Sequence, residues 1–83
     1  MSVVISVDFH GLQRKLTRTD RIEIPIQEGK RVTDIMVYLK ECFPGLPLNE
    51  DMLLVTVNNQ ITSPDQVLEA DDSISFIPHI GGG

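Results

Sequence analysis

The sequence predicts an α+β domain: a mixed sheet of four to five strands with one main helix packed on one face. Three observations predict it. Several short segments alternate apolar and polar residues, a single segment has helical spacing, and 83 residues are enough to close one modest core. The elements follow in the order strand, strand, helix, strand, short strand, strand. One helix against one face of a sheet is a two-layer arrangement.

The first two strands are predicted from a period of two. Apolar residues alternate from Val3 to His10 and again from Arg21 to Ile26. The polar run from Gly11 to Asp20 between them predicts a hairpin with a long loop. The side chains expected to face the core are Val3, Ile5, Val7, Phe9, Ile22, Ile24 and Ile26. Those expected on the outer face of the first strand are Val4, Ser6, Asp8 and His10.

The helix is predicted between two local signals. Thr33 is a suitable N-cap, and Asp34 places a carboxylate in the first turn, near the positive end of the helix dipole. Pro44-Gly45 ends the helix after about three turns. The apolar stripe expected to face the sheet contains Ile35, Leu39, and Cys42 or Phe43.

Three further strands are predicted in the C-terminal half, over Leu53–Val57, Gln60–Thr62 and Ser73–Pro78. Asn58-Asn59 suits a tight turn because asparagine tolerates positive φ. The right-handed crossover rule favours the last strand lying beside the first, near the sheet centre. This order is the ubiquitin-like β-grasp arrangement. We expect residues 1–80 to form this domain and residues 81–83 a flexible glycine tail.

Composition excludes several classes of protein. The net charge of −5 disfavours nucleic acid as a partner, and no aromatic residues interleave with the basic cluster. That cluster is interpreted as a solvated hairpin and contains Arg14, Lys15, Arg18 and Arg21. No segment approaches the roughly 20 apolar residues of a membrane helix. The N-terminus does not resemble a secretory signal, and the single cysteine fits a reducing cytoplasm, so we expect no membrane association and a cytoplasmic location.

Side chains that could carry out catalysis are few. Cys42 is expected to be a small buried hydrophobe on the helix stripe. His10 and His79 could share the outer face but lack the further ligands of a zinc site, so no metal is expected. Asp71-Asp72 is interpreted as a turn former. We therefore expect this chain to bind no cofactor and to be no enzyme by itself.

The sequence ends in Gly81-Gly82-Gly83, two residues after the last predicted strand. Glycine has no side chain, so such a tail can extend and enter a narrow tunnel. An adenylating enzyme that uses ATP could activate the carboxylate of Gly83, and a sulfur or amine nucleophile could then displace AMP. The alternative is an inert terminal segment of the kind common at chain ends.

A partner-binding surface is expected beside the tail. If Ile74 and Phe76 face the core, Ile77 faces outward, with Ile61 on the same side and Leu54 nearby. Apolar residues grouped on a solvent face indicate a protein-binding patch, although scattered exposed apolar residues are also normal. The residues expected to contact a partner are Ile61, Ile77, His79, Ile80 and Gly81.

Roughly the last 27 residues resemble the MoaD branch of the MoaD/ThiS sulfur-carrier family, the small subunits of molybdopterin synthase. The resemblance rests on Val57-Asn58-Asn59-Gln60-Ile61, Val67-Leu68, Asp72 to Ile80 and the terminal glycines. The N-terminal half matches only in its pattern of elements. Three positions depart from the family: Asp71 replaces a turn glycine, His79 a second proline, and Arg14-Lys15 an Arg-Glu pair.

The resemblance implies a sulfur carrier rather than an enzyme. An E1-like, ATP-dependent enzyme would adenylate Gly83, and sulfur would convert it to a thiocarboxylate. The tail, with Gly82 and Gly83 as its reactive end, would then enter the molybdopterin synthase large subunit or a similar acceptor. Two alternatives remain open: a ubiquitin-like modifier conjugated through the same glycine, and a β-grasp interaction domain with an inert tail.

Overall fold

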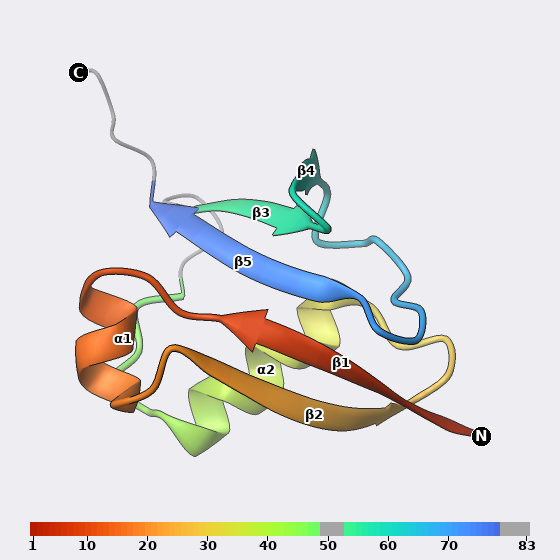
Figure 1. Cartoon of the computed structure of the whole chain (residues 1–83), viewed down its shortest axis with the longest axis horizontal. Helices are drawn as coiled ribbons and strands as arrows, with labels where there is room; N and C mark the ends of the chain where they lie inside the picture. Colours follow the sequence, from red (N-terminus) through yellow and green to blue (C-terminus); the bar gives the residue numbers. More distant parts are fainter. Residues whose placement is uncertain (49–52, 79–83) are drawn as a thin grey trace.

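The computed structural model describes residues 1–48 and 53–78 (Figure 1). Within these residues it contains one five-stranded sheet and two helices. The elements are β1 (Ser2–Asp8), α1 (Leu12–Thr17), β2 (Arg21–Gln27), α2 (Val32–Cys42), β3 (Leu53–Val57), β4 (Gln60–Thr62) and β5 (Ser73–Pro78).

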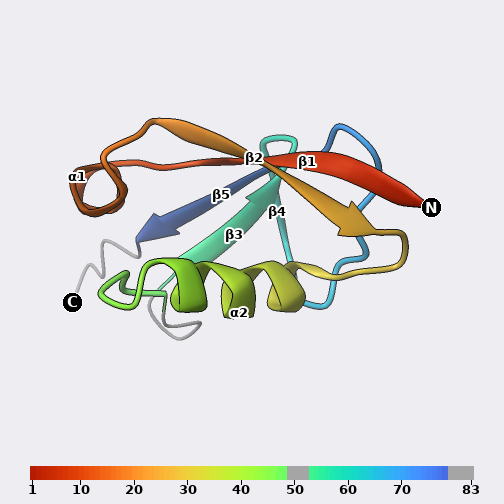
Figure 2. The ribbon, with the colours of Figure 1, turned by 90° about the horizontal axis from the view of Figure 1, so that it is seen from below.

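The sheet has the strand order β2-β1-β5-β3-β4, so β5 is the central strand. It pairs in parallel with β1, where Val7 lies opposite Ile74, and antiparallel with β3, where Val55 lies opposite Phe76. The predicted position of the last strand beside the first is confirmed. Figure 2 shows α2 lying across one face of the sheet, which gives the two layers of a ubiquitin-like β-grasp fold.

The core lies between α2 and the facing side of the sheet. The alternation in the first strand correctly predicted the buried Ile5, Val7 and Phe9, and both Ile74 and Phe76 of β5 are fully buried. Burial of each such side chain contributes on the order of 1.5–3 kcal/mol. The buried apolar residues are Ile5, Val7, Phe9, Ile24, Ile26, Val32, Ile35, Met36, Leu39, Leu46, Leu48, Leu53, Val55, Leu68, Ile74 and Phe76.

Turns that precede β5 depend on asparagine and aspartate. Asn58 and Asn59 have φ values of 53° and 69°, so the positive φ expected of the two asparagines is confirmed, and Asp71, in place of a turn glycine, also has a positive φ of 66°. The buried carboxylate of Asp72 accepts hydrogen bonds from the Asn58 amide (2.9 Å) and from the Glu69 backbone N–H (2.7 Å). The Asn58 side chain in turn accepts from the Ser73 N–H at 3.0 Å. These bonds fix the point at which β5 begins.

The start of α2 corrects the sequence prediction, because Thr33 is not the N-cap. The helix begins at Val32, and Arg31 is the N-cap in an extended conformation. The Val32 and Thr33 N–H groups donate to the carbonyls of Gln66 (3.1 Å) and Pro64 (3.0 Å). Because a neighbouring loop satisfies these amides, no hydroxyl cap is needed. Asp34 does lie in the first turn, where its carboxylate accepts from the Arg31 N–H at 2.8 Å.

Helix α1 is a second correction, because the sequence predicted a loop from Gly11 to Asp20. Gly11 starts the helix with a φ of 54°, and Arg18 ends it in a left-handed conformation with its N–H donating to the Arg14 carbonyl (2.8 Å). Its only buried residue is Gln13, and both of its leucines are exposed. A helix without a buried apolar stripe leaves no periodic signal in the sequence.

Gln13 attaches α1 to the sheet. Its side-chain amide donates to the backbone carbonyl of Phe76 at 2.8 Å in a buried position. The pairing between β1 and β5 ends at Ser75 of β5. Beyond that point, Gln13 provides the hydrogen-bond donor for the Phe76 carbonyl. One side chain therefore holds α1 against the last part of the central strand.

Replacing Gln13 with methionine should lower the free energy of unfolding by about 1–3 kcal/mol, because the Phe76 carbonyl then stays buried without a donor. Urea unfolding of the purified protein measures this change. The matched control is Leu12→Met in the same helix turn, which should alter stability by less than about 0.5 kcal/mol. Equal stabilities of the two variants would show that the hydrogen bond does not hold α1 in place.

Candidate functional site

The predicted reactive residues Gly82 and Gly83 lie outside the described residues, as do His79, Ile80 and Gly81. The structure does describe the strand that leads to them. β5 is paired on both sides along much of its length, and its last residue, Pro78, lies opposite Leu53 of β3. The chain therefore approaches the glycines from the most constrained strand of the sheet.

Two apolar residues, Ile77 and Leu54, lie side by side on the outer face near the end of β5, and a third, Ile61, lies farther away on the same face, in β4. Ile77, 42% exposed, lies opposite the half-buried Leu54. Ile61, 70% exposed, lies opposite Thr56, which shares a sheet face with Leu54 because side chains alternate along a strand. The predicted outward orientation of Ile77 is confirmed. A role in partner binding for Ile61 and Ile77 remains a prediction.

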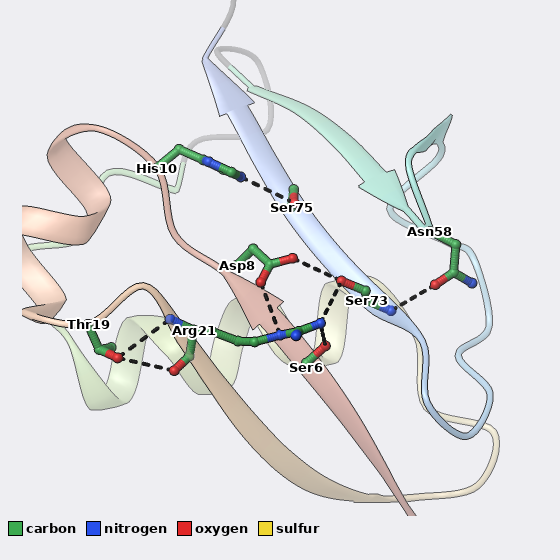
Figure 3. Close-up of polar contacts among 8 residues, drawn as sticks. All are labelled: Ser6, Asp8, His10, Thr19, Arg21, Asn58, Ser73 and Ser75. Atoms are coloured by element: carbon green, nitrogen blue, oxygen red, sulfur yellow. Dashed lines mark hydrogen bonds and ion pairs between the residues drawn. The ribbon is translucent and has the colours of Figure 1, made fainter.

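The centre of the outer face is polar and internally connected (Figure 3). The Arg21 guanidinium lies 3.1 Å from one oxygen of Asp8, and the Ser73 hydroxyl donates to the other at 2.9 Å. Arg21 also donates to the Ser6 hydroxyl at 3.1 Å. Three strands, β1, β2 and β5, are thus joined across the face that is turned away from α2.

This network was only partly predicted. Ser6 and Asp8 were placed on the outer face, but Arg21 was interpreted as one of several solvated cations. The register of the sheet brings these side chains together, because Asp8 lies opposite Arg21 on one side and opposite Ser75 on the other. Alternation predicts that Asp8 and Arg21 lie on neighbouring strands, but it does not specify which residues of the two strands are paired.

His10 lies on the same face, with its Nε2 atom 3.4 Å from the Ser75 hydroxyl (Figure 3). Its predicted companion, His79, is outside the described residues. In residues 1–48 and 53–78, no group of three His, Cys, Asp or Glu side chains is placed to hold a metal ion. Neither of the helices in these ranges is long and apolar enough to cross a membrane.

Cys42 corrects another prediction, because its side chain is exposed rather than buried. The buried stripe of α2 contains Val32, Ile35, Met36 and Leu39, and the chain continues it with the partly buried Phe43. Cys42, seven residues after Ile35, lies at the edge of this stripe and is the last residue of the helix, where its side chain stays exposed. The neighbouring Cys42 side chain raises the pKa of the exposed Tyr38 phenol above its ordinary value.

An apolar groove of about 580 Å³ lies between β2 and α2 and is lined in part by Ile24, Ile26 and Tyr38. Strand β2 is separated from β5 by β1, so this groove is remote from the end of the central strand. Pro25 lies within this edge strand and removes one backbone donor that an added strand would need. The groove does not belong to the candidate site.

A family model identifies the chain. The fold, with its central strand leading toward a glycine-rich end, defines a small ubiquitin-like β-grasp protein. The ThiS family model matches residues 7–83, nearly the whole chain, so the chain belongs to the ThiS family, whose members are small ubiquitin-fold carrier and modifier proteins. No curated protein sequence matches significantly.

Solved structures support the same assignment. A protein from Pyrococcus furiosus named as molybdopterin converting factor, subunit 1, is 27% identical, with a TM-score of 0.78, 92% of this chain covered and 97% of that one. Small archaeal modifier protein 1 from Methanosarcina acetivorans has a TM-score of 0.79 at 17% identity, with 100% and 99% covered. Urm1 from Trypanosoma brucei has a TM-score of 0.70 at 20% identity, with 99% and 97% covered. The last two show similarity of fold alone.

Replacing Ile77 with aspartate should weaken binding to any protein that engages the outer face while changing the free energy of unfolding by less than about 1 kcal/mol. The matched control is Ile74→Asp in the same strand, where burial of an unpaired carboxylate should cost about 4 kcal/mol or more. Urea unfolding of both variants measures the difference. A comparable loss of stability in the two would place Ile77 on the core side.

Cys42 should react with iodoacetamide in the native protein at a rate comparable to that in the urea-unfolded protein, because its side chain is exposed. Mass spectrometry of timed samples measures the rate. Strong protection of the native thiol would instead support the buried position that the sequence predicted.

Proposed function

We propose that this protein is a sulfur carrier whose C-terminal Gly83 is adenylated and then thiocarboxylated, and that it donates this sulfur in molybdopterin synthesis. One observation carries the proposal: in a chain of the ThiS family, the central strand leads directly toward Gly81-Gly82-Gly83. Its partners are an E1-like adenylating enzyme and the molybdopterin synthase large subunit or a similar acceptor, and it acts in the cytoplasm.

The chemistry requires no catalytic side chain of this protein. An oxygen of the Gly83 carboxylate attacks the α-phosphorus of ATP, pyrophosphate leaves, and an acyl adenylate forms. A sulfur nucleophile at the oxidation level of hydrosulfide then attacks the carbonyl carbon and displaces AMP. The product is a thiocarboxylate. The activating enzyme supplies ATP, orientation and electrostatic stabilisation, so this chain is a cosubstrate and binds no cofactor itself.

Two observations support the molybdopterin pathway: a structural match over nearly the whole chain and a sequence resemblance in the C-terminal half. The protein from Pyrococcus furiosus that is named as a molybdopterin converting factor subunit covers nearly the whole chain. The strand and turn that resemble the MoaD branch are β3–β4 with Asn58-Asn59, followed by β5. The departure at Asp71 does not disturb this arrangement, because Asp71 adopts the left-handed conformation that a glycine would take.

A second candidate function uses the same activated glycine. If a lysine amine instead of sulfur attacks the acyl adenylate or a derived thioester, the product is an isopeptide-linked protein conjugate. The fold similarity to small archaeal modifier protein 1 and to Urm1 favours this candidate. Immunoblots of native cell extracts separate the two, because a modifier produces covalent ladders on other proteins and a dedicated carrier does not. An interaction domain with an inert tail would give neither ladders nor adenylation.

Deleting Gly83 should abolish adenylation, measured as ATP-dependent pyrophosphate release with the cognate activating enzyme. The free energy of unfolding should change by less than about 0.5 kcal/mol, because the core is formed by residues before the tail. Ala70→Gly, an exposed substitution that leaves the terminus intact, is the control and should retain full activity. Sulfur transfer by the truncated protein would contradict the tail mechanism.

A further inference from the structure

Positive charge is concentrated in one short part of this acidic protein. The chain has seven basic and twelve acidic residues. Four of the basic residues, but only Asp20 among the acidic ones, fall between Leu12 and Arg21. These basic residues are Arg14, Lys15, Arg18 and Arg21. Helix α1 and the turn after it are therefore positive while the rest of the chain is strongly negative.

Two of these cations are available to a partner. Arg21 forms an ion pair with Asp8. Arg14 lies 3.5 Å from Asp20, and both of these side chains are well exposed. Such exposed pairs are weak and exchange readily. Across the described ranges, Lys15 and Arg18 form no ion pair.

The same helix exposes apolar surface. Leu12 is 59% exposed and Leu16 is 45% exposed. Four residues apart, they lie on one face of the helix. The inward position of α1 is taken by Gln13, so neither leucine contributes to the core. The two leucines therefore give the positively charged helix an exposed apolar face that a partner protein can cover.

This surface is held beside the end of the central strand. Gln13 binds the Phe76 carbonyl, only two residues before Pro78 ends β5. Figures 1 and 2 both show α1 at the end of the molecule toward which β5 points. A protein that binds the chain after Pro78 is therefore close enough to contact α1 as well.

We propose that α1 docks an acidic patch, containing apolar side chains, on the enzyme that activates the tail. The inference rests on the proposed function for the identity of that partner. Opposite charges accelerate encounter and orient the two proteins, and the leucines add contact area that slows dissociation. The strong negative charge elsewhere on this chain disfavours binding of the same enzyme patch at other faces. The helix thereby selects both the partner and its orientation.

The test compares two variants that each reverse one charge, so that both variants have the same net charge. Lys15→Glu changes α1, whereas Lys30→Glu changes the turn between β2 and α2, at the opposite end of the molecule (Figure 1). Stopped-flow binding to the activating enzyme is measured at low and at physiological salt. Lys15→Glu should lower the association rate constant about threefold to tenfold at low salt, with a smaller effect at physiological salt. Lys30→Glu should change it less than about twofold.

Two further variants make the result independent of local folding. Lys15→Gln removes the charge without placing an acid near the C-terminal end of the helix, and it should give a smaller effect in the same direction. Leu16→Ser should raise the dissociation rate constant about threefold or more and leave association nearly unchanged. Unfolding midpoints of all variants verify that the domain is intact.

Equal association rate constants for Lys15→Glu and Lys30→Glu, with wild-type protein adenylated normally, would overturn this inference and leave the proposed function standing. Absence of adenylation of the wild-type protein would overturn both. Flotation of wild-type protein, but not of Lys15→Glu, with phosphatidylserine-containing vesicles would also overturn it, because the occupant of α1 would then be a membrane surface.

Discussion

Pairing of β5 on both of its edges is the constraint on which the rest of the structure depends. The strand lies parallel to β1 and antiparallel to β3, and its inward residues Ile74 and Phe76 are fully buried. Beyond the point where β1 stops pairing with β5, the side-chain amide of Gln13 donates to the backbone carbonyl of Phe76. The segment that leads toward the terminal glycines is thereby anchored by backbone, core and side-chain interactions together.

Fixing this strand gives the proposed chemistry of the terminal glycine a firmly held support. The outer face has a polar centre built on Asp8 and Arg21, with Ile77 and Leu54 paired near the end of β5. Such a surface can orient the domain on a larger protein. In the function proposed for this protein, binding energy from the domain positions the glycine carboxylate, while the partner supplies the reacting groups.

The sequence predicted features that depend on local periodicity or on backbone preference. Alternation in β1 and β5 identified the core side of each strand, and the positive φ angles of Asn58 and Asp71 follow from their tolerance of the left-handed region. The crossover rule also predicted the position of β5 beside β1, but two other features that depend on contacts between distant parts of the sequence were not predicted. Thr33 is no N-cap because a distant loop satisfies the first amides of α2, and α1 is held by one glutamine rather than by an apolar stripe.

Intact mass spectrometry of the protein purified from its native cells tests the central claim most directly. We expect a fraction of the chains to show replacement of one oxygen by sulfur, located at Gly83 by fragmentation, and to lose this shift on incubation with the sulfur acceptor. Chains that carry only an unmodified carboxylate, even with the activating enzyme and ATP present, would contradict the assignment of this protein as a sulfur carrier.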